Sequence, residues 1–319
     1  MNTRFDPKLT IDAKEEIEKI AARIRQEVVN TFRKRGAVVG ISGGIDSSVT
    51  LALAVKAMGA DKVLGIMLPE QDSDSKSKKL AQELADRYSV RTLTEPMSPA
   101  LEGFGCYTRR DEAIRKVFPE YTSAYRMKIT LPQTDYTRDR LNFYQITIID
   151  PEGTASTRRL PLDAYLQIVG ASNFKQRSRM AMLYYHAELN NYAVLSTANK
   201  DEHDLGFIVK FGDGAGDMFP LRHLFKIQVY QLAEFLDIPP VIRERTPTSD
   251  TYSADQTQKE FFFGLEFEKL DPVWYGWDQG IPESAISEAT GLSIEQVINI
   301  IKDIRRKISA TEYLRMPPI

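Results

Sequence analysis

The run Ser42–Ser48, with the sequence SGGIDSS, carries residue types that bind phosphate. It follows the apolar run Ala37–Ile41 and precedes the apolar run Val49–Ala54, an order that predicts a strand, a tight turn and a helix. Such a turn directs several backbone N–H groups and a helix N-terminus at one point, where an anion is stabilised. The two glycines permit close approach and unusual backbone angles. The serine hydroxyls add donors, and Asp46 is placed to hold a metal ion that bridges phosphate oxygens.

The run differs from the two common glycine motifs. No Lys follows the glycines as in a Walker loop, and their spacing is not the dinucleotide fingerprint. The alternative is a turn rich in serine and glycine that only caps a helix. The flanking strand and helix patterns favour phosphate binding.

Elsewhere the chain predicts the elements that position this turn. We expect strands at 62–68, 90–93 and 192–197, and helices at 11–32, 75–88, 177–189 and 225–236. Strands that alternate with helices indicate an α/β fold with a doubly wound parallel sheet. Ligands of such sheets lie beyond the C-terminal ends of the strands, which is where the Ser42–Ser48 turn falls.

The segment of about 107–172 follows another pattern. Residues 125–131 and 143–149 alternate polar with apolar or aromatic side chains, and Asp150–Gly153 is a strong turn signal. We expect a β-hairpin or small sheet inserted into a single domain that spans 1–319. Residues 246–258 are expected to form a mobile loop. Helices at 283–290 and 294–309, within a C-terminal helical region of about 280–319, favour a packing element over a DNA-binding helix pair.

Composition restricts the function classes. The net charge of −2 argues against a nucleic-acid partner, and no stretch is apolar enough to span a membrane. The only cysteine, Cys106, excludes an internal disulfide framework and a cysteine-based zinc site. With no signal-peptide core at the start, the chain is expected to be cytoplasmic.

The SGGIDSS turn resembles the pyrophosphate loop of the N-type ATP pyrophosphatases. Three further segments in order, Asn173–Met180, Ser196–Gly214 and Pro247–Thr257, are similar to motifs of the NAD synthetases. The resemblance covers 15–105 and 173–318 and leaves 107–172 outside. It implies an ammonia-dependent ligase that forms a C–N bond: ATP adenylates the carboxylate of deamido-NAD, and ammonia then gives NAD, AMP and pyrophosphate.

The resemblance also implies residue roles. Asp46 and Glu202 would hold Mg²⁺, and Asp46, Lys226 and Thr248 would serve catalysis. The ATP site would comprise Ser42, Gly43, Gly44, Ile45, Asp46, Ser47, Ser48, Leu68, Gln71, Thr197, Lys226 and Thr248. Deamido-NAD would be bound by Arg177, Phe207, Lys210, Asp213 and Arg315.

These roles have structural alternatives. In the alternative interpretation, Glu202 and Lys226 are solvent-exposed charges on helices, Phe207 is a core residue, and Lys210 complements the charge of a helix end. Near the C-terminus, Arg315 is retained where the family has further cations, which leaves the identity of the acid open. The 107–172 segment offers replacement cations: Lys128, Arg138, Arg140, Arg158 and Arg159.

The partners follow from the same resemblance. The chain has no room for an amidase domain, so ammonia would be free or passed from a separate glutaminase subunit, and a homodimer is expected. The alternatives are a paralogue acting on another carboxylic acid, a tRNA-thiolating enzyme, and a non-catalytic protein that binds adenine nucleotides.

Overall fold

A four-stranded parallel sheet lies at the centre of the protein. The structure is a computed structural model, and it describes residues 5–132, 135–137, 143–249 and 251–317. The sheet has the order β3-β2-β1-β7 and consists of β1 (Ala37–Gly40), β2 (Val63–Met67), β3 (Arg91–Thr94) and β7 (Ala193–Leu195). All three pairings are parallel, with Val38 opposite both Leu64 and Val194. The parallel α/β fold that the sequence predicts is confirmed.

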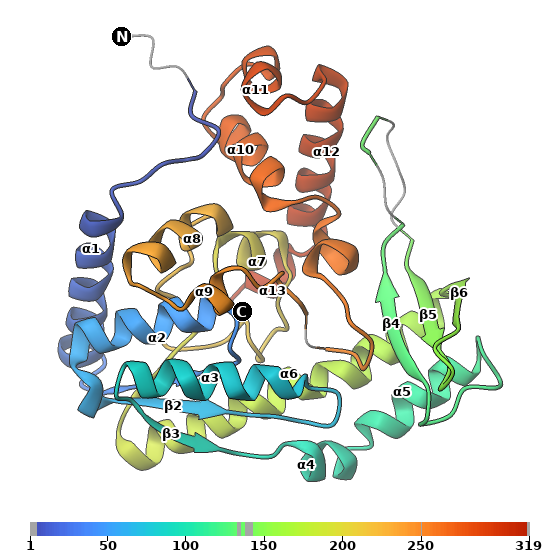
Figure 1. Cartoon of the computed structure of the whole chain (residues 1–319), viewed down its shortest axis with the longest axis horizontal. Helices are drawn as coiled ribbons and strands as arrows, with labels where there is room; N and C mark the ends of the chain where they lie inside the picture. Colours follow the sequence, from blue (N-terminus) through green and yellow to red (C-terminus); the bar gives the residue numbers. More distant parts are fainter. Residues whose placement is uncertain (1–4, 133–134, 138–142, 250, 318–319) are drawn as a thin grey trace.

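Helices cover both faces of this sheet (Figure 1). The side chains of Ala37 and Val39 pack into a core shared with α1 (Ala13–Arg25), α2 (Ile45–Met58), α3 (Ser75–Arg87) and α8 (Lys226–Phe235). Val38 points to the opposite face, where α6 (Leu162–Asn190) packs through Leu183 and its neighbours. The alternation follows from the two-residue period of a strand. The other helical segments are η1 (Gln26–Thr31), η2 (Ala60–Lys62), α4 (Ser98–Gly103), α5 (Cys106–Arg115), α7 (Lys200–Leu205), α9 (Pro240–Arg243), η3 (Lys259–Phe263), α10 (Phe267–Asp278), α11 (Glu283–Thr290), α12 (Ile294–Ala310) and α13 (Glu312–Arg315).

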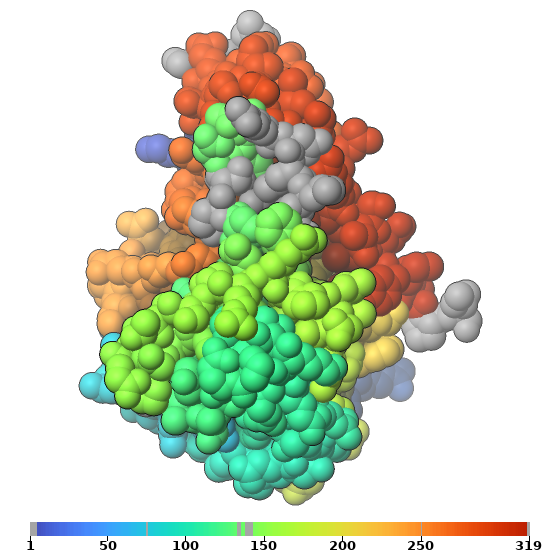
Figure 2. Space-filling view, turned by 90° about the vertical axis from the view of Figure 1, so that its right-hand side faces the viewer, coloured from blue at the N-terminus to red at the C-terminus, as the bar shows by residue number. Residues whose placement is uncertain are grey.

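The middle of the chain forms a second sheet. It is antiparallel, with the order β4 (Arg126–Thr130), β5 (Gln145–Ile149) and β6 (Ala155–Arg159), and it packs with α5 and the start of α6 around its own apolar cluster. Figure 2, which views the molecule from this side, shows the segment below the C-terminal helices. The expected small sheet is present, and the Asp150–Gly153 turn joins β5 to β6.

One helix boundary and two whole elements differ from the expectation. Helix α6 begins at Leu162 rather than near residue 177, because Pro161 at its N-cap starts an apolar segment that continues into the core helix. Strand β6 was not predicted, since all five of its residues are exposed and carry no apolar alternation. Helix α10 was missed because Pro272 interrupts its pattern. Among the described residues, no helix has both the length and the apolar character needed to cross a membrane.

Candidate functional site

A cavity of about 800 Å³ opens at the carboxyl ends of β1, β2 and β7. Its position follows from the parallel sheet, in which strand ends and the loops after them meet at one edge. The residues that line it lie between positions 40 and 314. They come from α6, α7 and α8, from the loop before η3 and from the end of α12, among other segments. Fourteen of the predicted site residues are in its wall: Ser42, Gly44, Ile45, Asp46, Ser47, Leu68, Arg177, Thr197, Glu202, Phe207, Lys210, Asp213, Lys226 and Thr248.

The turn after β1 is held by its own hydroxyls. The Oγ atoms of Ser47 and Ser48 donate to the Gly44 carbonyl oxygen at 3.0 and 2.8 Å, and the Gly44 N–H donates to Ser42 Oγ at 3.3 Å. Gly43 has a φ of +72°, and an added Cβ would lie 2.6 Å from the Ser77 carbonyl oxygen. Gly43 and Ser48 therefore shape the turn from behind the cavity wall, and the N-terminus of α2 faces the cavity.

Asp46, Lys226 and Glu202 meet beside this turn. Lys226 Nζ donates to Asp46 Oδ2 and lies 3.9 Å from Glu202 Oε1. The Lys226 side chain is 1% exposed. Burial lowers its pKa, but Asp46 and Glu202 outweigh burial and raise it above the usual value. Lys226 thus stays charged at the cavity wall.

Two of these residues, Asp46 and Glu202, carry carboxylate oxygens of the kind that a divalent cation such as Mg²⁺ binds. Burial and the nearby Asp46 carboxylate raise the pKa of Glu202 to about 8. Two carboxylates that disfavour each other's charge are what a cation between them would stabilise. Carboxylate oxygens suit Mg²⁺, which retains water and phosphate ligands. Within the described part of the chain, no cluster of three or more acidic, His or Cys side chains forms a metal site.

Two further residues of this group were missed by the sequence reasoning. Asn199, fully buried, accepts from the Glu202 N–H at 3.0 Å and donates from Nδ2 to Asp46 Oδ1 at 2.8 Å. Gln258 Nε2 donates to Glu202 Oε1 at 3.1 Å. Asn199 lies within the Ser196–Gly214 motif, and its N-cap position before α7 was the signal for a structural role.

Lys226 is positioned through its backbone as well. At the start of α8 its N–H donates to Asp201 Oδ2 at 2.7 Å, and the Ile227 N–H donates to Asp271 Oδ2 at 2.9 Å. These carboxylates come from α7 and α10. Carboxylates at a helix N-terminus are stabilised by the unpaired N–H groups and the helix dipole. Helix α8 therefore starts at a fixed point that presents Lys226 to the cavity.

On the expected nucleotide side, Leu68, Thr197 and Thr248 line the cavity, whereas Gln71 is exposed outside its wall. Leu68 follows β2, and Thr197 lies between β7 and α7. Thr248 pairs with Thr257 in a single antiparallel bridge, so the 246–258 loop returns on itself beside the cavity.

On the expected acid side, Arg177 Nε donates to the Lys210 carbonyl oxygen at 3.2 Å. Lys210 Nζ donates to the carbonyl oxygens of Tyr313 and Met316 at 2.9 and 3.2 Å. Asp213 accepts from the Val209 N–H at 2.7 Å, and burial raises its pKa to about 6.

Arg315 lies outside the cavity wall. Its guanidinium donates to the carbonyl oxygens of His203 and Ile308 and to Thr311 Oγ1. These bonds hold α13 against α7 and α12, and α13 in turn receives the Lys210 ammonium. Among the candidate cations of the 107–172 segment, Arg158 lies over the Phe118 ring and Lys128 faces Glu260, whereas Arg138 and Arg140 lie outside the described residues.

Aromatic side chains form one end of the cavity. Phe207 stacks on Phe262 with ring centroids 5.0 Å apart, and Tyr144 stacks on Tyr165 at 4.6 Å. All four line the cavity, together with Tyr252 and Phe261. The two tyrosines come from the segment of about 107–172. The sequence did not reveal that this segment contributes to the site, because Tyr144 and Tyr165 reach the same cavity as Phe207 only in the folded chain.

The model of the NAD synthase family matches residues 16–136 and 140–318. The chain belongs to the NAD synthase family. The match includes almost all of 107–172, so the expectation that this segment falls outside the resemblance was wrong. The family model matches most of this segment, for which the sequence pattern predicted an inserted hairpin or small sheet.

Curated relatives agree with this family. The protein named NH(3)-dependent NAD(+) synthetase of Mesorhizobium japonicum is 43% identical over 311 residues, which cover 98% of this chain and 97% of that one. The protein of the same name from Rhizobium meliloti is 44% identical over 310 residues, which cover 97% and 92%.

Solved structures share the fold. The NMN synthetase from Francisella tularensis has a TM-score of 0.66 at 22% identity, and the match covers 97% of this chain and 98% of that one. An NH3-dependent NAD synthetase from Campylobacter jejuni has a TM-score of 0.63 at 20% identity, with 97% and 99% covered. At this identity the likeness shows the fold alone.

Proposed function

We propose that this protein is an ammonia-dependent NAD synthetase, which uses ATP to adenylate deamido-NAD and ammonia to release NAD and AMP. The observation that carries the proposal is the group of Asp46, Glu202 and Lys226 beside the Ser42–Ser48 turn, at the edge where a parallel sheet binds ligands. The family match and the names of its near-full-length relatives support the reaction.

The ATP phosphates are proposed to lie at the turn. The N-terminus of α2 and the hydroxyls of Ser42 and Ser47 face the cavity there. Asp46 and Glu202 would hold Mg²⁺, which supplies positive charge to the phosphate oxygens. Lys226 would add a second, permanent charge. These groups reduce the repulsion between a carboxylate and the α-phosphate that it attacks.

Thr248 is proposed to close the phosphate site, and Leu68 and Thr197 to flank the nucleotide. All three line the cavity from separate loops. Gln71 is exposed outside the wall, so it is the weakest member of the proposed ATP site.

The acid is proposed to occupy the aromatic end. Phe207 offers a ring to the nicotinate, and Arg177, Lys210 and Asp213 offer polar groups from the same wall. The cavity contains both ends in one space of about 800 Å³, within the range of ligand-binding pockets. Arg315 would act through α13, whose last turn receives the Lys210 ammonium.

The wider assignments extend the same proposal. Residues 1–319 would act as one domain, with 107–172 as an insertion and 280–319 as a helical appendage. The enzyme would be a cytoplasmic homodimer that takes free ammonia or ammonia from a separate glutaminase subunit.

The test is NAD formation from deamido-NAD, ATP and Mg²⁺, with ammonium or glutamine as nitrogen donor. We expect NAD with ammonium only. Nicotinic acid mononucleotide is offered as the alternative acid substrate in a parallel assay, because the fold alone does not distinguish between the two acids. Preference for the mononucleotide would favour a paralogue, and nucleotide binding without pyrophosphate release would favour a non-catalytic protein.

A further inference from the structure

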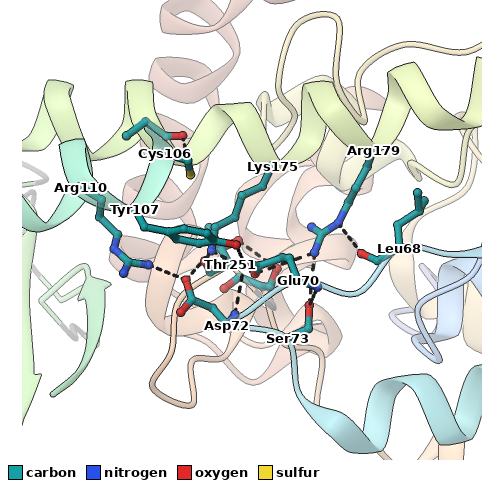
Figure 3. Close-up of polar contacts among 12 residues, drawn as sticks. Leu68, Glu70, Asp72, Ser73, Cys106, Tyr107, Arg110, Lys175, Arg179 and Thr251 are labelled. Carbon is teal, nitrogen blue, oxygen red and sulfur yellow. Dashed lines mark hydrogen bonds and ion pairs between the residues drawn. The ribbon is translucent and has the colours of Figure 1, made fainter. Parts of the chain in front are cut away.

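Lys175 is a buried lysine in the middle of α6 whose ammonium has three acceptors. Its side chain is 1% exposed. Nζ donates to Glu70 Oε1 at 3.0 Å, to Asp72 Oδ2 at 2.6 Å and to the Thr251 carbonyl oxygen at 2.7 Å (Figure 3). An ammonium has three N–H donors, so each has a partner.

Two of these acceptors belong to the loop after β2. This loop is also held by other side chains of α5 and α6, as Figure 3 shows. Tyr107 donates to Glu70 Oε2 at 2.8 Å, and Arg110 pairs with Asp72. Arg179 Nε donates to the Leu68 carbonyl oxygen at 3.1 Å. The loop that carries Leu68 into the cavity wall is therefore fixed to α5 and α6.

The third acceptor belongs to a different segment. Thr251 lies three residues beyond Thr248, and both residues line the cavity. Thr251 Oγ1 donates to the Ser249 carbonyl oxygen at 3.0 Å, which joins the contacted residue to the Thr248 side of the loop. Lys175 thus connects the segments that present Leu68 and Thr248.

A buried ion network is weak evidence of stabilisation, because desolvation offsets most of its Coulombic gain. Here one bond goes to a main-chain carbonyl rather than to a carboxylate, and charge-assisted bonds of this kind are short and directional. That bond gives the network an effect on geometry, since it specifies where the Thr248 loop rests.

We propose that Lys175 is a positioning residue that sets the place of Thr248 over the ATP phosphates by linking its loop to the loop after β2. The inference rests on the proposed function, because it assigns the phosphate-closing role to Thr248. Lys175 lies in the cavity wall, and in the proposed role it acts through the two loops that its ammonium joins.

The test is a double-mutant cycle of Lys175→Met and Thr248→Ala. We expect Lys175→Met to raise KM for ATP about tenfold, with KM for deamido-NAD changed less than about threefold. In the Thr248→Ala background the same change should raise KM for ATP less than about threefold, because its route of action is gone. The control is Lys56→Met, which removes a lysine of α2 that pairs with Glu18 of α1 and should leave both constants unchanged.

Lys175→Met removes the buried cation nearest to Glu70 and lowers stability, so a second variant is needed. Glu70→Gln with Lys175→Gln removes one charge of each sign and leaves Asp72 its Arg110 partner. Cys106 reports on packing, because this only cysteine is buried and its thiol donates to the Ala171 carbonyl oxygen of α6. A Cys106 labelling rate equal to that of the wild type shows that α5 and α6 remain packed.

The cycle is measured with Lys175→Met and with the Glu70→Gln, Lys175→Gln pair. For either one, effects that add to those of Thr248→Ala, or equal rises in KM for ATP and for deamido-NAD, would overturn the role of Lys175. The two proposals fail differently. If the wild type makes no NAD from deamido-NAD, the proposed acid is wrong, and the same cycle is then measured as Kd for ATP. If the wild type makes NAD but the cycle is additive, only the role of Lys175 is wrong.

Discussion

Lys226 on α8 donates to the Asp46 carboxylate on α2, although 180 positions separate them in the chain. Asp46 lies in the first turn of α2, the helix that follows β1, and Lys226 is the first residue of α8. Both helices pack on one face of the sheet, so their N-termini converge at its carboxyl edge. The contact places an anion and a cation side by side, as the proposed metal and phosphate roles of Asp46 and Lys226 require.

Replacing Asp46 with Asn tests the anion of this pair. Asn keeps an oxygen for the Asn199 amide but removes the charge that would hold Mg²⁺ and pair with Lys226. We expect kcat/KM to fall about a hundredfold or more, with the fold retained by circular dichroism. Asp61→Asn is the exposed control and should be near wild type. Pyrophosphate release at the wild-type rate by the Asp46 variant would exclude the metal role.

Glu202 is expected to set the requirement for Mg²⁺. Glu202→Gln removes one of two carboxylates and relieves the repulsion with Asp46, so the variant should fold at least as well as the wild type. The Mg²⁺ concentration for half-maximal NAD formation should rise about tenfold, and a chelator should abolish wild-type turnover until Mg²⁺ is restored. The control Glu83→Gln changes an exposed glutamate on α3. Identical Mg²⁺ curves for wild type and the Glu202 variant would contradict the assignment.

Gly43 is expected to be irreplaceable for steric reasons. Its φ of +72° disfavours any side chain, and an Ala Cβ would meet the Ser77 carbonyl oxygen at 2.6 Å and Leu80 Cβ at 2.9 Å. Gly43→Ala should lower the free energy of unfolding by about 1–3 kcal/mol and weaken ATP binding. Gly103→Ala, where no atom lies within 4 Å of the new Cβ, should be neutral or slightly stabilising in urea unfolding. Equal midpoints for the two variants would show that the turn tolerates a side chain.

Much of this arrangement was predictable from the sequence because it depends on local patterns. The apolar run before Ser42 and the helical run after Ser48 specify a strand, a turn and a helix, and the structure contains them. Long-range packing was not predictable. Lys175 meets Glu70 across 105 positions, and nothing in the neighbourhood of either residue signals the other.

The same limit applies to the second sheet. Strand β6 owes its existence to pairing with β5, since its own side chains are all exposed. Tyr144 reaches the cavity only because this sheet packs beside α6. In each case the deciding free energy comes from contacts with distant residues rather than from propensity.

Asp213 predicts a pH dependence of stability. Burial raises its pKa from 3.8 to about 6, so between these values the folded protein binds a proton that the unfolded chain releases. This group therefore stabilises the fold most below about pH 4, and its contribution declines as pH rises to about 6. Asp213→Asn removes the decline and keeps an acceptor for the Val209 N–H. The melting temperature of the variant should gain a few degrees on the wild type between about pH 4 and pH 6.5. Parallel melting curves across this range would contradict the raised pKa.

The fate of one oxygen atom tests most directly whether the protein adenylates a carboxylate, that is, whether the carboxylate attacks the α-phosphate of ATP. Deamido-NAD labelled with ¹⁸O in its nicotinate carboxylate is incubated with the protein, ATP, Mg²⁺ and ammonium, and the products are weighed by mass spectrometry. If the carboxylate is adenylated and then amidated, AMP carries one labelled oxygen for each NAD formed. AMP without label, or label in pyrophosphate, would contradict the account.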